Sequence, residues 1–320
     1  MKYYLAPMEG VTGRIFRRAY DTCFPSMDKY FTPFLCPNED GRLSSKEYQE
    51  IAPEYNEGLF LVPQILTNHA DGFIRTARTL KEMGFEEVNL NLGCPSGTVV
   101  SKKRGSGFLA YPQELDQFLY EIFSKTEIKI SIKTRLGKER EEEFEKLLDI
   151  YNRYPVEELI IHPRVREDYY KNLPRLDAFT KGFSHSFSPV CYNGDIFTVS
   201  DYHRLIKRYP ALDRVMLGRG IVANPGLLRQ IQTGTPVSRE QLKEFHDRLY
   251  DGYRDFFLAT SGQRVILFKM KEFWSYMICM FPDSKKQEKR IKKAGSLSEY
   301  ETAAAALFRD GCFSDSAEFS

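Results

Sequence analysis

A few reactive and basic side chains stand out in this sequence, and each follows a short apolar run. Cys94 can act as an acid or a nucleophile, because a thiol loses its proton not far above neutral pH. Lys133 and Arg135 are two residues apart, so both can point the same way from a strand and bind an anion. His162 can donate a ring N–H to an oxygen. These residue types suit the binding of an anionic ligand with a proton transfer beside it.

Two glycine-containing turns could hold a phosphate group. They are Asn193-Gly194-Asp195 and Gly218-Arg219-Gly220. Glycine lets backbone N–H groups approach phosphate oxygens closely, and Arg219 can hold those oxygens with two N–H groups. Glycine turns alone can simply shape a loop. The combination of two such turns with an arginine favours a phosphate site.

The elements that position these side chains read as alternating strands and helices. Periodicity predicts strands near 3–7, 28–36, 59–66, 87–92, 128–135, 157–162, 188–193 and 213–218. Helical stretches between them include 72–83, 113–123, 139–152 and 200–207. Eight strands, most followed by a helix, predict a (β/α)8 barrel, whose active sites lie at the carboxyl ends of the strands. The competing doubly wound sheet lacks its GxGxxG fingerprint after the first strand.

The pattern changes after the turn at 233–236. Ser238, with Gln241 three residues later, predicts a capping box that opens a helix. The residues that follow have helical periodicity and no strand pattern. We therefore predict an α/β fold, with a (β/α)8 TIM barrel at 1–236 followed by a small all-helical C-terminal domain at 237–320.

Composition narrows the class of protein. The chain has 320 residues, a formal net charge of +2 and 28% charged residues, as expected of a soluble globular protein. No run reaches the roughly 18 apolar residues of a membrane span, and the start lacks a signal peptide, so we expect a cytoplasmic protein. The six cysteines form no CxxC pair, and no metal site is predicted. Basic clusters at 102–104 and 285–293 are by default solvated faces.

The strand ends carry a series of motifs that resembles the tRNA-dihydrouridine synthase family. The stretches APMEGVTGRIFR, VNLNLGCPSGTVVSKKRGSG, IKTRLG, IHPRVREDYY, YNGDIF and VMLGRGIVANP stand in that family's order and span residues 5–226. The NxGCP strand end combined with IHPR and YNGD is specific, whereas an NGDI-like or GR-like turn by itself occurs in several kinds of flavin barrel. The family combines a flavin-binding barrel with a small helical domain. Pro163 departs from its pattern, which often has glycine or a small hydrophobic residue there.

The resemblance implies an enzyme that reduces a specific uridine in the D-loop of tRNA to 5,6-dihydrouridine. FMN would be the cofactor, re-reduced by NADPH, with a hydride passing from flavin N5 to uracil C6. Cys94 would give a proton to C5, because an unperturbed thiol with a pKa of about 8.5 is mostly protonated at neutral pH. A buried structural cysteine is the alternative. The run 264–276 resembles the branch whose bacterial members modify position 16.

Site residues follow from the same resemblance. The residues assigned to the cofactor are Pro7, Met8, Gln64, Lys133, His162, Asn193, Gly194, Asp195, Gly218 and Arg219. Asn91 is expected to read the uracil edge, Arg135 to contact the flavin or the base, and Arg164 to face phosphate. The residues expected to hold tRNA phosphates are Lys102, Lys103, Arg104, Lys289, Arg290, Lys292 and Lys293.

Two other functions stay open from sequence alone. One is a small-molecule flavin oxidoreductase of the dihydroorotate dehydrogenase or enoate-reducing type, which would not need the helical domain. The other is a tRNA-binding barrel without catalysis, which the presence of Cys94, Lys133 and His162 argues against. In each case we expect a monomer.

Overall fold

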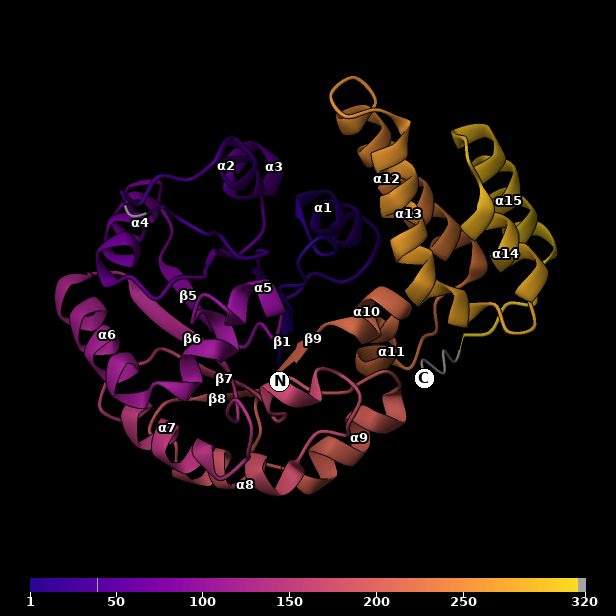
Figure 1. Ribbon diagram of the computed structural model, residues 1–320. Helices are drawn as coiled ribbons and strands as arrows, with labels where there is room; N and C mark the ends of the chain where they lie inside the picture. Colours follow the sequence, from indigo (N-terminus) through magenta and orange to yellow (C-terminus); the bar gives the residue numbers. More distant parts are fainter. Residues whose placement is uncertain (39, 316–320) are drawn as a thin grey trace. The chain divides into compact units, whose positions relative to one another are not determined.

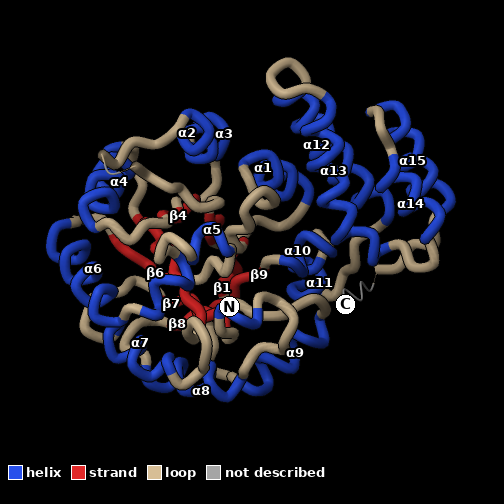
Figure 2. The backbone as a smooth tube through the Cα atoms, viewed as in Figure 1, coloured by secondary structure: helices blue, strands red, loops and turns tan. Residues whose placement is uncertain are grey.

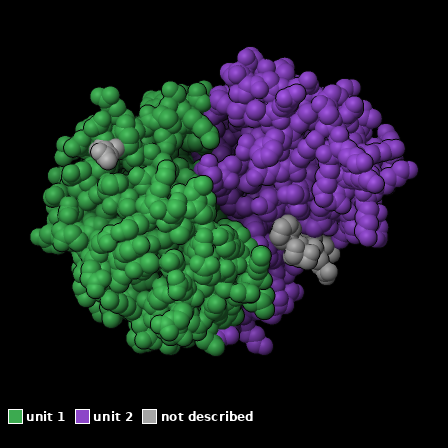
Figure 3. Space-filling model, viewed as in Figure 1, with its two compact units in different colours: residues 1–7, 28–194, 212–216 green, residues 8–27, 195–211, 217–320 purple. Residues whose placement is uncertain are grey.

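The computed structural model (Figure 1) describes residues 1–38 and 40–315. These residues divide into two compact units, which Figure 3 colours separately. Unit 1 contains residues 1–7, 28–194 and 212–216. Unit 2 contains residues 8–27 and 195–211 together with the described part of 217–320.

Unit 1 is built on a parallel sheet. In the described part of the chain nine strands form one sheet, in the order β3-β2-β1-β9-β8-β7-β6-β5-β4. Their bounds are β1 Lys2–Leu5, β2 Lys29–Phe31, β3 Leu61–Val62, β4 Gln64–Ile65, β5 Glu87–Leu92, β6 Lys129–Arg135, β7 Leu159–His162, β8 Val190–Tyr192 and β9 Arg214–Leu217. The two ends of this order, β3 and β4, are separated in the chain by Pro63 alone, which has no N–H for the ladder. The sheet therefore curls into a nearly closed barrel.

Helices of unit 1 surround the strands (Figures 1 and 2). They are α2 Ser45–Ile51, α3 Pro53–Asn56, α4 Ala70–Glu82, α6 Pro112–Lys125, α7 Glu143–Tyr151 and α8 Leu176–His185. The short α5, Gly97–Val100, lies inside this ring in both views. Neighbouring helices share aromatic contacts: the rings of Phe73 on α4 and Phe118 on α6 lie edge to face, 6.0 Å apart. Each predicted strand region contains a strand, and the region 59–66 contains two because Pro63 divides it. The (β/α)8 prediction is confirmed.

The side chains that point into the barrel include an apolar cluster and a few polar residues. Its buried apolar cluster consists of Tyr4, Ala6, Phe31, Val62, Ile160, Cys191 and Met216. Across the sheet, Asn91 lies beside Lys133, Lys133 beside Ile160 and Ile160 beside Cys191. This register puts Asn91 and Lys133 on the inward face, together with the cluster.

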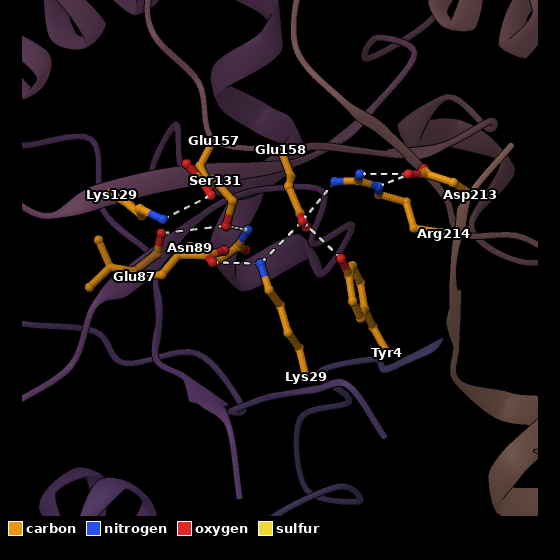
Figure 4. A network of polar contacts seen from close by, with 11 residues as sticks. Tyr4, Lys29, Glu87, Asn89, Lys129, Ser131, Glu157, Glu158, Asp213 and Arg214 are labelled. Carbon is orange, nitrogen blue, oxygen red and sulfur yellow. Dashed lines mark hydrogen bonds and ion pairs between the residues drawn. The ribbon is translucent and has the colours of Figure 1, made fainter. Parts of the chain in front are cut away.

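An ionic network closes the amino-terminal end of the barrel (Figure 4). The Lys29 ammonium lies 2.6 Å from Glu87 Oε2 and 3.2 Å from Glu158 Oε1. Arg214 Nη1 and the Tyr4 hydroxyl also donate to Glu158 Oε1, at 2.9 and 2.8 Å. All five side chains are buried, so each charge depends on its partners rather than on water.

Unit 2 is helical apart from the end of β9. Its helices are α1 Arg14–Cys23, α9 Val199–Arg208, α10 Arg219–Ala223, α11 Leu227–Thr233, α12 Arg239–Phe257, α13 Gln263–Met277, α14 Lys285–Lys293 and α15 Leu297–Asp310. The predicted capping box is confirmed, since Ser238 Oγ accepts from the Gln241 N–H at the start of α12. Phe16 of α1 packs against Phe245 and Phe273 of α12 and α13, each ring pair 5.6 Å apart.

These contacts group α1 with the C-terminal helices in unit 2, whereas a domain boundary at residue 236 stays a prediction. None of the helices in the described chain has the length and hydropathy of a membrane span. The same residues contain no cluster of three or more His, Cys, Asp or Glu side chains able to hold a metal ion.

Candidate active site

Cys94 lies in a tight turn directly after β5. Its N–H and that of Gly93 both donate to Asn91 Oδ1, at 2.9 and 3.0 Å. Its carbonyl accepts from the N–H and the hydroxyl of Ser106, at 3.1 and 2.8 Å. Gly105, with φ +56°, passes so close that a Cβ there would lie 2.9 Å from the Cys94 carbonyl oxygen. The turn is therefore held from both sides, which fixes the direction of the half-buried thiol.

Asn91 and Gln64 contact each other inside the barrel. Asn91 Nδ2 donates to Gln64 Oε1 at 2.7 Å, and Gln64 Nε2 donates to Asn89 Oδ1 at 2.8 Å. The side-chain amides of Asn91 and Gln64 are thus both hydrogen-bonded within the protein, and that of Asn91 also binds the Cys94 turn. Their assignments to substrate and cofactor stay predictions.

Lys133 is an inward-pointing cation near Cys94. Burial, reinforced by the charge of Arg135, lowers the pKa of Lys133 to about 8, while Cys191 and Cys94 act in the opposite direction. Among the described residues no carboxylate forms an ion pair with its ammonium. Lys133 is half-buried, and a cation that loses part of its hydration without a carboxylate partner is costly, so an anionic ligand at this position would relieve that cost. This is the feature of unit 1 that best fits a bound flavin, which in its reduced form carries negative charge at the N1–O2 edge.

Arg135, at the end of β6, is fully buried and binds backbone. Its guanidinium donates to the carbonyls of Gly93, Val165 and Tyr169, each at 2.9 Å. It therefore ties the Cys94 turn to the loop after β7. The geometry favours a supporting role for Arg135, and a direct contact with the flavin or the base stays a prediction.

His162 ends β7 and lies beneath a tyrosine. Its Nε2 is 3.0 Å from Arg164 Nη1, and its ring stacks on that of Tyr170 with centroids 5.9 Å apart. Arg164 is buried and also donates to the Asn172 carbonyl at 2.6 Å. The structure thus directs Arg164 inward, which favours orientation of His162 over contact with phosphate.

The two predicted phosphate turns show why they contain glycine. A Cβ on Gly194 would lie 2.1 Å from the Tyr192 hydroxyl, and one on Gly220 would lie 2.0 Å from the Ile196 carbonyl oxygen. Asn193 Nδ2 donates to the Met216 carbonyl at 2.9 Å, so its amide also supports the sheet. A larger residue would clash with the Tyr192 ring at position 194 and with the backbone of Ile196 at position 220.

The remaining cofactor candidates divide between the units. Pro7 lies in unit 1, and Met8, Asp195, Gly218 and Arg219 lie in unit 2. In unit 2, Arg219 Nη2 donates to Asp195 Oδ1 at 2.6 Å, and its guanidinium carbon lies 5.2 Å from the centroid of the Phe197 ring. The Met8 carbonyl accepts from the N–H groups of Val11 and Thr12.

The two basic clusters differ in how far they are engaged. In the loop after α5, Lys103 lies 3.3 Å from Glu114 and 4.0 Å from the Tyr111 ring centroid, and Arg104 Nε donates to Asn68. Lys102 is exposed. On α14 the basic residues are all exposed, namely Lys285, Lys286, Lys289, Arg290, Lys292 and Lys293, and Lys292 also pairs with Glu288. Helix α14 is therefore the more accessible cationic surface.

Sequence reasoning missed several residues of this site. Asn89, Ser106 and Ser131 were not assigned a role, although Ser106 binds Cys94 and Asn89 binds Gln64. A signal for Asn89 is present, because polar side chains at 87, 89 and 91 occupy one face of a fully buried strand. Ser106 carries no such signal, since it reaches Cys94 only through the fold of its loop.

Comparison with known proteins identifies the family to which this chain belongs. A family model described as Dihydrouridine synthase (Dus) matches residues 4–304. One curated relative is a protein of Pasteurella multocida (strain Pm70) named tRNA-dihydrouridine synthase B, which is 26% identical over 72% of this chain and 69% of the relative. Another is a protein of Aquipseudomonas alcaligenes named tRNA-dihydrouridine(16) synthase, which is 28% identical over 72% of this chain and 75% of the relative. A third, from Staphylococcus aureus (strain COL), is named probable tRNA-dihydrouridine synthase and is 30% identical over 70% and 69%.

Solved structures share the fold at low sequence identity. Histamine dehydrogenase from Rhizobium sp. 4-9 superposes with a TM-score of 0.56 at 12% identity, covering 85% of this chain and 49% of that one. TcOYE with pHBA superposes with a TM-score of 0.51 at 12% identity, covering 80% and 95%. At these identities the likeness establishes the fold alone.

Proposed function

Because this chain belongs to the dihydrouridine synthase family, we propose that it reduces a uridine of tRNA to 5,6-dihydrouridine with a flavin cofactor. The observation that carries the proposal is the Cys94 turn, held on one side by Asn91 and on the other by Ser106, on the same end of the barrel as Lys133. Together they supply a positioned thiol beside a cation that has no carboxylate partner within residues 1–38 and 40–315.

The residues divide the chemistry between them. A bound reduced flavin, FMN in this proposal, supplies the hydride that goes to uracil C6. The Cys94 thiol donates a proton to C5, so the double bond gains one hydride and one proton and the sulfur becomes a thiolate that takes up a proton from solvent. Lys133 stays protonated below pH 8 and pairs with the negative edge of the cofactor. Arg135 holds the turn that carries the thiol.

Phosphate and RNA contacts complete the proposal. Arg219, with the backbone of its glycine turn, binds the flavin phosphate, and NADPH re-reduces the flavin. The exposed cations of α14 contact tRNA phosphates. The uridine at position 16 of the D-loop is the proposed target, as in the name of the Aquipseudomonas alcaligenes relative.

The first experiment separates the two half-reactions in a Cys94→Ala variant. Reduction of the flavin by NADPH involves no uracil, so its rate should not change. Oxidation of the reduced flavin by unmodified tRNA should slow by about a hundredfold or more, the usual contribution of a general acid. Stopped-flow absorbance of the flavin measures both steps. A variant with the wild-type rate of tRNA-dependent oxidation would remove Cys94 from the mechanism.

The second experiment tests α14. Replacement of Lys289, Arg290, Lys292 and Lys293 by Gln should weaken tRNA binding, because each phosphate contact releases counterions. The slope of log affinity against log salt should flatten by roughly 0.7 to 0.9 per lost contact. Replacing Lys81, Lys125, Lys129 and Lys181, four exposed cations of unit 1, by Gln removes the same number of charges and serves as a control. Equal effects of the two sets would place the tRNA footprint away from α14.

A further inference from the structure

A chain of hydrogen-bonded side chains crosses the barrel interior and ends at the Cys94 turn. Starting from that turn, Asn91 Oδ1 accepts from the Cys94 N–H, and Asn91 Nδ2 donates to Gln64 Oε1 at 2.7 Å. Gln64 Nε2 donates to Asn89 Oδ1 at 2.8 Å, and Asn89 Nδ2 donates to Ser131 Oγ at 2.9 Å. Every link has its donor on the side of Cys94 and its acceptor on the side of Ser131.

The strands put these side chains in register. Gln64 of β4 lies beside Asn89 of β5, and Asn89 lies beside Ser131 of β6. Gln64, Asn89 and Ser131 are fully buried, so water cannot substitute for a missing partner. Figure 4 shows Asn89 and Ser131 next to Glu87 and Lys29, and the pKa of Glu87, raised by burial, is held down by Lys29 and by the Ser131 hydroxyl.

The direction of the chain has a consequence for Asn91. A side-chain amide presents an oxygen on one side and an NH2 group on the other, and only the oxygen can accept from the N–H groups of Gly93 and Cys94. A rotated Asn91 would set two donors against those N–H groups. Gln64 Oε1 accepts from Asn91 Nδ2 and so opposes this rotation, while Asn89 in turn fixes Gln64 and Ser131 fixes Asn89.

We infer that Gln64, Asn89 and Ser131 are positioning residues that orient Asn91 and, through it, the Cys94 thiol. This inference rests on the proposed function, because it concerns the proton that Cys94 donates. It assigns roles to Asn89 and Ser131, neither of which touches Cys94. Its effect is confined to the tRNA-dependent half-reaction, since reduction of the flavin does not use the thiol.

A matched pair of hydroxyl deletions on β6 tests the inference. Ser131→Ala removes the last acceptor of the chain, whereas Thr134→Val removes a hydroxyl that contacts Tyr151 at 3.0 Å outside it. Both hydroxyls are buried, so both variants lose stability, and thermal unfolding checks that the losses are similar. Ser131→Ala should slow tRNA-dependent flavin oxidation at saturating tRNA by about tenfold, because small misplacements of a reacting group are costly. Thr134→Val should retain the wild-type rate, and both should retain the wild-type KM for tRNA.

Two further readings separate positioning from general loosening. In a background with Cys23, Cys36, Cys279 and Cys312 replaced by Ser, the pH profile of Cys94 alkylation by iodoacetamide should shift in Ser131→Ala and not in Thr134→Val. An Asn89→Leu variant should be slower than Ser131→Ala, and the double variant no slower than Asn89→Leu alone, because both interrupt one chain. Equal rates for Ser131→Ala and Thr134→Val in an active wild-type background would overturn the inference. A wild-type protein inactive on tRNA would instead overturn the proposed function.

Discussion

The two ends of the barrel in unit 1 balance the charge of their cations in opposite ways. At the amino-terminal end, Lys29 and Arg214 are balanced by Glu87 and Glu158, and the ion pairs raise the pKa of Lys29 even though burial lowers it. At the carboxyl end, Lys133 has no carboxylate partner in the described residues, and burial lowers its pKa to about 8.

The difference separates stabilisation from binding. A buried cation surrounded by carboxylates satisfies its charge within the fold and leaves nothing for a ligand. A half-buried cation with a depressed pKa and no carboxylate partner is a mark of a functional site. In the same barrel, Lys29 forms ion pairs at the amino-terminal end, and Lys133 is available to an anion at the carboxyl end. This agrees with the location of active sites at the carboxyl ends of barrel strands.

The largest expected effect is on stability at the closed end. Lys29→Met leaves two buried carboxylates with one cation fewer and should lower the free energy of unfolding by about 3–5 kcal/mol. Lys133→Met removes a cation that has no ion pair, so it should not lower the stability of the flavin-free protein. Urea unfolding of the flavin-free variants measures both.

A double variant provides the control for this comparison. Lys29→Met combined with Glu87→Gln removes one charge of each sign and should recover part of the loss. Similar losses for Lys29→Met and Lys133→Met would show that the two ends do not differ in the way described.

The amino-terminal end of the barrel also shows which features could be predicted from the sequence. The strands around it were predictable from periodicity, and strand ends carrying Cys94, Lys133 and His162 pointed to the site because parallel strands align their carboxyl ends. The partners of Lys29 were not predictable, since they come from residues 87 and 158, far away in sequence. Periodicity predicted a single strand at 59–66, whereas the structure has β3 and β4 there because Pro63 divides them.

The site shows the same limit. Arg135 and Arg164 have the residue types of anion ligands, which is the basis of their predicted roles. Both are buried and donate to backbone carbonyls, and their contact with a ligand stays a prediction. Which of several arginines faces a ligand depends on loops whose conformation long-range contacts decide. Likewise, α1 precedes the second strand in the chain but packs on α12 and α13 through Phe16, which no pattern in its own sequence indicates.

A smaller effect is expected on the pH dependence of flavin binding at the carboxyl end. With a pKa near 8, Lys133 is charged at pH 7 and largely neutral at pH 9.5. Because the proposed flavin contact requires the ammonium, the affinity of the flavin-free protein for FMN should fall as pH rises through 8. The fall should amount to about fivefold to tenfold between pH 7 and 9.5, since each pKa unit of coupling is worth at most tenfold. Quenching of FMN fluorescence on titration with protein measures the affinity.

Two variants at residue 133 serve as controls. Lys133→Met should bind FMN more weakly and lose this part of the pH dependence, whereas Lys133→Arg should keep its charge and bind FMN with a flat profile across the same pH range. The phosphate contacts are common to all three proteins, so the difference between their profiles isolates residue 133. Parallel profiles for the wild type and Lys133→Met would mean that the lone cation does not face the flavin, and the two ends of the barrel would then differ in charge balance alone.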